Sequence, residues 1–208
     1  MNQLKHWKIE TRTFSSTDCA VVEGETQAGT RTLLRFPAGF PNLGPGDLII
    51  GNPLDHPELF DFVTCHGHPH FKEYADYRLW TLSGWSDWDA LRAANPGALA
   101  RDLLEAHPEL ASQMVAGAKQ GFCSIDVYRY ATRERATYTS CIYNQGISVG
   151  WGDLYGPSLD GQWVDITNLA PGKYMLEVEV NAEQLFEEED YSNNRGATAV
   201  TISAGKKK

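Results

Sequence analysis

The sequence predicts a mainly β protein: an antiparallel β-sandwich-like domain with long loops and a helical insertion over about residues 80–118. Segments of alternating apolar and polar residues, separated by turns rich in Pro and Gly, indicate the strands. Helix-type apolar spacing is confined to the insertion. The chain has 208 residues, of which 42% are hydrophobic and 11% aromatic. This length and composition suit one hydrophobic core, so we expect a single domain over residues 1–208.

The first half of the chain is expected to hold two strands around an irregular loop. Residues 31–36 (RTLLRF) predict a strand, and the Pro and Gly residues of segment 37–47 predict a loop. Residues 59–71 alternate, which predicts one further strand with six side chains on the same face. Those side chains are Phe60, Phe62, Thr64, His66, His68 and His70.

The insertion is expected to be three short helices. Residues 87–94 have a helical pattern that ends at the NPG sequence, residues 98–107 have another that ends at Pro108, and residues 108–119 predict a third. Three tryptophans, Trp80, Trp85 and Trp88, lie at its start. We expect them to attach the insertion to the core; forming a lid over a functional site is the alternative role.

The second half of the chain is rich in predicted strands, at residues 122–130, 162–169, 172–180 and 197–203. The strand over 172–180 shows the clearest alternation. One face carries Tyr174, Leu176, Val178 and Val180, and the other carries Met175, Glu177 and Glu179. This pattern predicts an antiparallel strand with one face in the core and the other in solvent.

Composition excludes several classes of protein. The formal net charge of −9 argues against a nucleic-acid-binding protein, which usually carries a basic face. No stretch approaches the roughly 20 apolar residues of a membrane span. The first residues contain no apolar signal core, which leaves either a cytoplasmic protein or a mature or trimmed form. The four cysteines form no C-x-x-C pair, so two disulfides and buried free thiols both remain open.

The alternating histidines are the strongest chemical signal. Three imidazoles on one strand face can bind copper, zinc, iron or nickel. A structural zinc site would also need cysteine and a fourth ligand, and Cys65 is expected to point to the opposite face. Three nitrogens with open positions therefore favour Cu(II) or a catalytic zinc at His66, His68 and His70. The spacing does not choose between the two metals, and a polar strand edge is the non-metal alternative.

The residues of several motifs resemble those of the lysyl oxidase family. TCHGHPHF, residues 64–71, looks like the family's copper-binding signature, and residues 33–47 are similar to the strand and loop that precede it. Residues 144–194 resemble the family's catalytic C-terminal half, with the elements QGIS, D-x-Y-G, QWVDIT, PGKY and DYSNN in the expected order. The resemblance covers most of residues 31–200.

The resemblance implies a chemistry and its residues. The family makes its own cofactor, lysine tyrosylquinone, from a tyrosine in the D-x-Y-G element and a lysine ahead of a Phe-Cys pair; here these are Tyr155 and Lys119. It implies a copper-dependent oxidase that uses molecular oxygen to convert primary amines, peptidyl lysine or small amines, to aldehydes with release of ammonia and hydrogen peroxide. Asp153 could be the catalytic base, or its carboxylate could cap a turn. Lys72 is the rival cofactor lysine, in a context that does not match.

The sequence also departs from the family. Two cysteines that bracket the cofactor tyrosine in animal members are replaced by Trp151 and Gly161, and the segment between His70 and Lys119 is longer by about two helices. The resemblance implies a bridge between Cys65 and Cys141, which leaves Cys19 and Cys123 as an unsupported second pair. It also implies a secreted or cell-surface location, because the family is typically extracellular and the bridge needs an oxidising compartment.

Two other functions remain open at this point. The DYSNN element and the sandwich-like C-terminal half would also suit a non-enzymatic copper-binding or cell-surface β-domain. A zinc hydrolase would use the three histidines with a nearby carboxylate base, for which Glu73 is available, although no HExxH pattern occurs. For the oxidase, the expected partners are a primary amine or a lysine-containing protein and molecular oxygen, with no nucleic acid and no membrane span.

Overall fold

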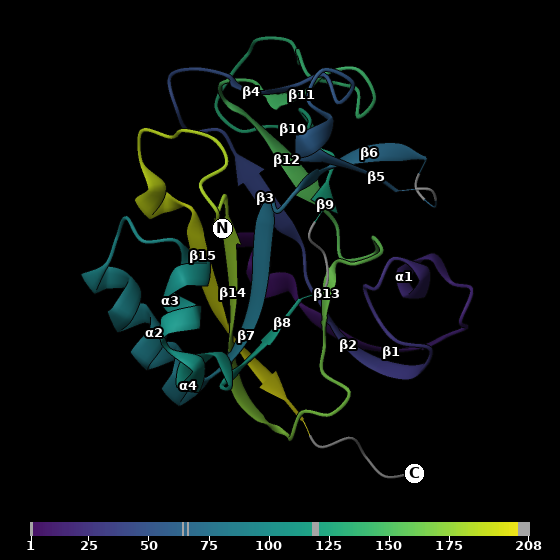
Figure 1. Cartoon of the computed structure of the whole chain (residues 1–208), viewed down its shortest axis with the longest axis vertical. Coiled ribbons are helices and arrows are strands. Elements are labelled where there is room, and N and C mark those ends of the chain that lie inside the picture. Colours follow the sequence, from purple (N-terminus) through teal and green to yellow (C-terminus); the bar gives the residue numbers. More distant parts are fainter. Residues whose placement is uncertain (1, 64, 66, 118–120, 204–208) are drawn as a thin grey trace.

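The computed structural model describes residues 2–63, 65, 67–117 and 121–203, and these form a mainly β fold (Figure 1). The strands are β1 (Lys8–Phe14), β2 (Gly29–Arg35), β3 (Ala38–Pro41), β4 (Leu48–Gly51), β5 (Phe60–Val63), β6 (His68–Lys72), β7 (Ala75–Thr81), β8 (Met114–Ala116), β9 (Gly121–Phe122), β10 (Tyr128–Arg129), β11 (Gln145–Ile147), β12 (Trp151–Tyr155), β13 (Trp163–Asp165), β14 (Gly172–Val180) and β15 (Arg195–Ile202). The helices are η1 (Asn2–His6), α1 (Cys19–Val22), η2 (Pro57–Leu59), α2 (Leu82–Ala94), α3 (Ala100–Ala106), α4 (Pro108–Ala111) and η3 (Tyr191–Asn193).

The strands form several small antiparallel sheets, which confirms the predicted fold class. The largest has the order β15-β14-β7-β8, and β1-β2-β13 forms a second. The orders β10-β12-β3, β11-β4 and β5-β6-β9 complete the arrangement at one end of the molecule (Figure 1). The main hydrophobic core lies between these sheets and is rich in aromatic side chains. None of the helices in the described part of the chain is long and apolar enough to cross a membrane.

The insertion covers the second face of the largest sheet. Helices α2, α3 and α4 pack there over a separate hydrophobic cluster that contains Trp80 and Trp88. These two indoles are fully buried and stack with ring centroids 5.2 Å apart. Their role is therefore to attach the insertion. The predicted third helix ends early, because residues 114–116 form β8 and pair with the edge of β7.

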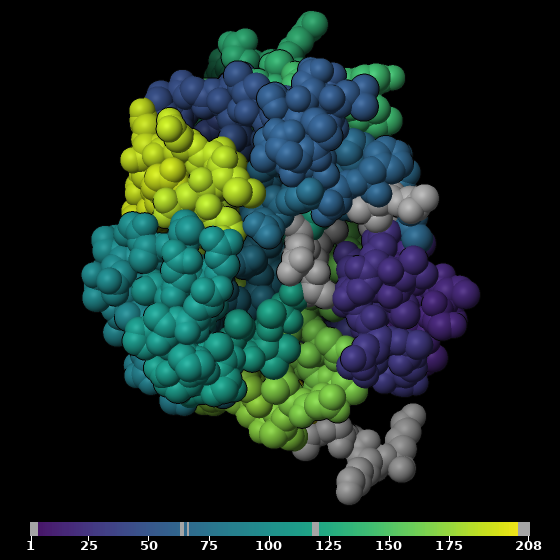
Figure 2. Space-filling model, viewed as in Figure 1, coloured from purple at the N-terminus to yellow at the C-terminus, as the bar shows by residue number. Residues whose placement is uncertain are grey.

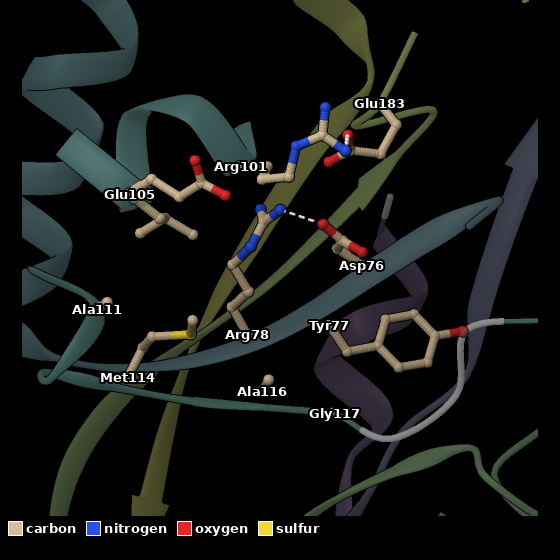
Figure 3. A pocket seen from close by; sticks show the side chains of 11 residues that line it. Asp76, Tyr77, Arg78, Arg101, Glu105, Ala111, Met114, Ala116, Gly117 and Glu183 are labelled. Atoms are coloured by element: carbon tan, nitrogen blue, oxygen red, sulfur yellow. Dashed lines mark hydrogen bonds and ion pairs between the residues drawn. The ribbon is translucent and has the colours of Figure 1, made fainter. Parts of the chain in front are cut away.

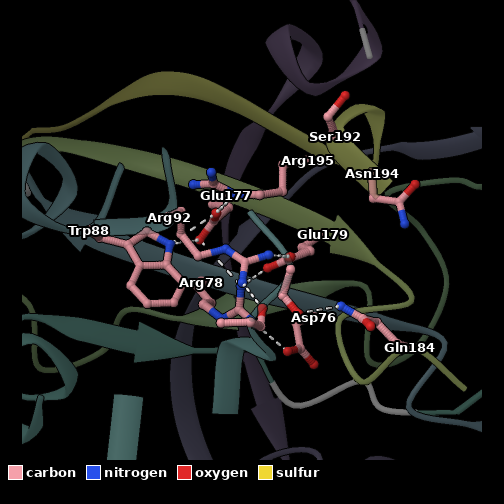
Figure 4. A network of polar contacts seen from close by, with 12 residues as sticks. Asp76, Arg78, Trp88, Arg92, Glu177, Glu179, Gln184, Ser192, Asn194 and Arg195 are labelled. Carbon is pink, nitrogen blue, oxygen red and sulfur yellow. Dashed lines mark hydrogen bonds and ion pairs between the residues drawn. The ribbon is translucent and has the colours of Figure 1, made fainter. Parts of the chain in front are cut away.

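The second face of β14 is buried, which corrects the expectation that it meets solvent. Glu177 and Glu179 are 0% and 2% exposed. The Glu177 carboxylate accepts hydrogen bonds from the Trp80 and Trp88 indoles at 2.9 and 3.1 Å and from Arg195 at 2.8 Å. Figure 4 shows Trp88 of α2 and Arg195 of β15 beside the Glu177 carboxylate. Burial of the carboxylates is stable because cationic and N–H donors surround them.

The prediction of one strand over residues 59–71 is wrong. The chain reverses between β5 and β6, which pair in the register Phe60↔Phe71 and Val63↔His68. Gly67, with φ of +68°, supplies a left-handed residue at the reversal. His68 and His70 keep their common face, whereas Phe60 and Phe62 belong to the partner strand. Thr64 and His66 lie outside the described residues.

The cysteine pairing also differs from the expected one. The disulfides join Cys19 to Cys65 and Cys123 to Cys141, with Cα–Cα distances of 5.7 and 5.3 Å. Cys65 lies in the connection between β5 and β6, which is tied to α1. Cys141 instead meets the segment that follows β9. The favoured pair, Cys65–Cys141, is therefore wrong, and the unsupported pair Cys19–Cys123 does not form either, because the β5–β6 connection lies against α1 and not against Cys141.

Candidate functional site

Two of the predicted metal ligands converge on one point. His68 and His70 lie two residues apart on β6, so they share a face. Their Nε2 atoms are 3.1 Å apart. Ligand nitrogens about 2 Å from one ion are separated by a similar distance, so this pair fits a metal. Within the described part of the chain no group of three potential ligand side chains occurs, and His66 lies outside that part.

Tyr155 is buried at the end of β12. Its side chain is 7% exposed, and its hydroxyl donates a hydrogen bond to the carbonyl oxygen of Cys123 at 2.8 Å. The ring meets Phe122 edge-on at 4.7 Å and lies 6.1 Å from Phe40, measured between centroids. Burial, reinforced by the charge of Asp153, raises the pKa of Tyr155 well above its ordinary value. The phenol is therefore neutral over the physiological pH range.

Asp153 is a buried carboxyl group next to this phenol. It is 2% exposed, and its Oδ1 atom accepts a hydrogen bond from the Leu154 amide at 2.8 Å. Burial raises its pKa to about 7, although the Tyr155 hydroxyl and the amides of Leu154 and Ile125 limit the rise. Asp153 lies within a strand and pairs with Phe40, so it caps no turn. A carboxyl group with this pKa can accept or release a proton near neutral pH.

One short segment connects the histidines to the phenol. Strand β9 pairs with β6, and a Cβ atom at Gly121 would lie only 2.9 Å from the Cβ of His70. Gly121 is followed by Phe122, which contacts the Tyr155 ring, and by Cys123, whose carbonyl oxygen accepts a hydrogen bond from the Tyr155 hydroxyl. The fold thus brings segments around residues 70, 122 and 155 together.

Lys119, the predicted cofactor lysine, lies outside the described residues, two positions before Gly121 in the sequence. Its rival, Lys72, forms an ion pair with Asp61 at 3.3 Å and donates to the Glu58 carbonyl at 3.1 Å. Lys72 is therefore engaged with β5 and η2. Glu73, the base considered for a zinc site, is exposed in the turn after β6.

Sequence reasoning missed a contribution from residues 15–28. Cys19 fastens this segment to the histidine hairpin. On its other side, the Glu25 carboxylate fills the space that a Cβ atom at Gly161 would need, and Gly161 has a φ of +72°. Figure 2 shows the β1–α1–β2 region (purple) on the side of the molecule opposite the helical insertion (teal). Glu25 thus covers Gly161, one of the two positions at which the resemblance implies a cysteine in animal members of the family. In the sequence, Cys19 was the one signal that residues 15–28 contribute.

A cavity of about 350 Å³ lies apart from these residues, between β7–β8 and the helices of the insertion. Figure 3 shows that the Arg101 and Glu183 side chains face each other at its rim, where they form an ion pair at 2.7 Å. Leu104 and Met114 contribute apolar surface. Among the described residues that line it, none is His68, His70, Tyr155 or Asp153.

Comparisons with known proteins agree with the motif resemblance. The family model for lysyl oxidase matches residues 100–206. Protein-lysine 6-oxidase from Gallus gallus is 33% identical over 79% of this chain and 32% of its own length. The Sus scrofa protein of the same name is 33% identical over 79% of the chain and 54% of its length, and lysyl oxidase homolog 1 from Homo sapiens is 30% identical over 81% and 24%.

The chain spans about a third of the length of the first of these relatives. A continuous stretch that covers 79% of the chain takes in its centre, so the aligned part includes the histidine hairpin and residues 153–156. The family model and the relatives thus both cover residues 153–156, and the relatives extend the match to the histidine hairpin. The chain belongs to the lysyl oxidase family.

Proposed function

We propose that this protein is a copper-dependent amine oxidase. Its substrates would be primary amines, either peptidyl lysine or small amines, which it would convert to aldehydes with release of ammonia and hydrogen peroxide. Its cofactor would be lysine tyrosylquinone derived from Tyr155 and Lys119. The observation that carries the proposal is the segment 121–123, which packs against His70 on one side and binds Tyr155 on the other.

The metal would be held by His66, His68 and His70. The convergence of two imidazole nitrogens to 3.1 Å supports this assignment, because neutral imidazoles suit Cu(II). When bound, copper and the quinone supply the two-electron oxidation of the amine, with molecular oxygen as the final acceptor. The protein would bring the phenol and the imidazoles together and would limit the access of bulk water to them.

Asp153 would accept the proton that leaves the α-carbon of the substrate. Its pKa of about 7 leaves it partly ionised at neutral pH, and its buried position makes it a stronger base than an exposed carboxylate. Phe122 and Phe40 line the same phenol and exclude water from it. The net charge of −9 is compatible with cationic substrates.

We also propose a secreted or cell-surface location. Two disulfides lie in the described part of the chain, and such bonds persist in oxidising compartments. Names of the similar proteins describe lysine oxidation, which supports a lysine-containing protein as one substrate.

The proposal is tested by peroxide release after the protein has been loaded with Cu(II) in air. An alkylamine or a lysine peptide should release peroxide with the wild-type protein, and Tyr155→Phe should abolish it. Tyr130→Phe, at a tyrosine that is 57% exposed, is the matched control and should keep full activity. A hydrazine should give a coloured adduct with the wild-type protein and none with Tyr155→Phe. A copper-loaded wild type without colour or peroxide release would instead indicate a non-enzymatic copper-binding domain.

A further inference from the structure

Gln145 forms a three-way junction beside the candidate site. It is the first residue of β11 and is 0% exposed. Its Nε2 atom donates to the carbonyl oxygens of Pro69 at 3.0 Å and Cys141 at 2.9 Å, and its Oε1 atom accepts from the Ser124 amide at 3.1 Å. Every neighbour is a backbone group of fixed polarity, so the amide has only one satisfying orientation.

The first of these bonds acts on the histidine strand. Pro69 lies between His68 and His70, and its carbonyl is its only backbone hydrogen-bonding group. The carbonyl of Pro69 shares a rigid peptide plane with the nitrogen of His70. A donor that holds this carbonyl therefore fixes the plane from which the His70 side chain projects, and so the spacing of the two imidazoles.

The opposite end of the same amide acts on Tyr155. The Ser124 amide that donates to Gln145 belongs to the same peptide plane as the Cys123 carbonyl, and that carbonyl accepts the Tyr155 hydroxyl. One peptide unit is thus held from both sides. An unbroken chain of hydrogen bonds runs from the Pro69 carbonyl through Gln145 and this peptide to the phenol.

We propose that Gln145 is a positioning residue that sets the place of the His68–His70 pair relative to Tyr155. An effect of Gln145 on catalysis rests on the proposed function, but its effect on the position of β6 and its two histidines does not. To hold both peptide groups, a side chain at position 145 needs both a hydrogen-bond donor and an acceptor at the length of glutamine. Glutamate keeps the acceptor for Ser124 and loses the donor, and methionine loses both.

Gln162 offers a matched control. It is also 0% exposed, its Nε2 atom donates to the Phe36 carbonyl at 3.0 Å, and its Oε1 atom accepts the Tyr77 hydroxyl at 2.9 Å. Replacing it by methionine removes a comparable buried amide from the core. Neither of these hydrogen bonds reaches the histidine strand or the segment 121–124.

The test compares Gln145→Met, Gln145→Glu and Gln162→Met by the Cu(II) electron paramagnetic resonance spectrum and by Cu(II) competition against a chelator. Both Gln145 variants should show an altered spectrum and an affinity lower by about tenfold or more, as for other outer contacts of metal ligands. Gln162→Met should keep the wild-type spectrum and affinity despite a similar loss of melting temperature. Gln145→Glu carries the test if Gln145→Met does not fold, because it keeps the bond to Ser124.

Wild-type spectra and affinities in both Gln145 variants would overturn the inference, and so would equal changes in the Gln145 and Gln162 variants. Failure of the proposed function gives a different result: the wild type would bind copper and form no quinone, while the Gln145 variants would still differ from Gln162→Met in the copper spectrum. The two conclusions are therefore tested separately.

Discussion

Asp153 and Tyr155 lie on the same face of β12, two residues apart, and both are buried. The carboxylate of Asp153 raises the pKa of Tyr155, and the hydroxyl of Tyr155 lowers that of Asp153. Each group therefore changes the proton affinity of the other. This pairing places a titratable carboxyl group beside the phenol that is proposed to become the quinone.

Activity should rise with pH as Asp153 ionises. Its pKa of about 7 predicts a rising limb with an apparent pKa near 7 in the pH profile of kcat/KM. Asp153→Asn should remove this limb and reduce kcat by about 100-fold or more. Steady-state peroxide release at several pH values is the measurement, with Asp87→Asn on the exposed side of α2 as the control. A profile of Asp153→Asn that keeps the wild-type limb and rate would exclude Asp153 as the base.

The same carboxyl group should influence stability in the opposite direction. Its folded-state pKa is raised from 3.8 to about 7, so its contribution to stability is complete below pH 3.8 and is lost as the pH rises through about 7. Asp153→Asn should remove that decline. Urea unfolding of both proteins at pH 5 and pH 8 measures the difference, and an unchanged pH dependence would contradict the assigned pKa.

Copper binding should depend on His68 and His70. Substitution of either by alanine removes one of two converging nitrogens and should lower the Cu(II) affinity by about 100-fold or more, since even outer contacts of metal ligands contribute 10- to 100-fold. Competition with a chelator measures the affinity. His107→Ala is the control, because His107 lies in the insertion and pairs with Glu109. Equal affinities in all three variants would place the metal elsewhere.

The two disulfides should differ in their contribution to stability. Cys19–Cys65 spans 46 residues and Cys123–Cys141 spans 18, which predicts losses of about 4 and about 3 kcal/mol when each pair is replaced by serine. Chemical denaturation measures both. Peptide mapping without reduction should recover the 19–65 and 123–141 linked peptides, whereas a 65–141 linked peptide would contradict the pairing.

The sheet face beneath the insertion should depend on its buried charges for stability. Glu177→Gln should destabilise the protein by about 3–5 kcal/mol, because Arg195 would lose its buried counter-charge and Arg78 would lose one of its three carboxylate partners. Glu189→Gln, at an exposed position, is the control and should change stability by less than about 0.5 kcal/mol. Similar unfolding free energies for the two variants would show that the network contributes little.

The contribution of Glu177 to stability should be lost in acid. Burial alone would raise the pKa of Glu177, but Arg78, Arg195 and the Trp80 indole hold it below the ordinary value of 4.5. Its contribution is therefore present above pH 4.5 and is lost as the pH falls further. Unfolding of the wild type should become easier below that pH, and Glu177→Gln should show a smaller acid dependence.

Local patterns predicted the strand-rich fold and the position of the insertion, but not the direction of the chain. Alternation over residues 59–71 looks the same in one strand and in a hairpin whose two arms are in phase, so the reversal before His68 was missed. The burial of Glu177 was missed for a related reason. Its donors, Trp80 and Trp88, come from a segment about 90–100 residues earlier in the chain.

The histidines, Tyr155, Lys119 and Asp153 were selected from motifs, whereas their surroundings required the fold. Cysteine spacing does not determine pairing, because the hairpin approaches α1 only in three dimensions. Gln145 belongs to the QGIS element, but the sequence assigns it no role, since its significance comes from the backbone groups of Pro69, Ser124 and Cys141 that the fold gathers around it. The disulfide pairing and the contacts of Gln145 follow from which segments the fold brings together, and residue type alone does not predict them.

The proposed quinone is tested most directly by mass spectrometry of proteolytic peptides from protein that has been loaded with copper in air. We expect a cross-linked species that joins the Lys119 peptide to the Tyr155 peptide and that is absent from copper-free protein. Linear Lys119 and Tyr155 peptides, both unmodified after copper loading, would contradict it.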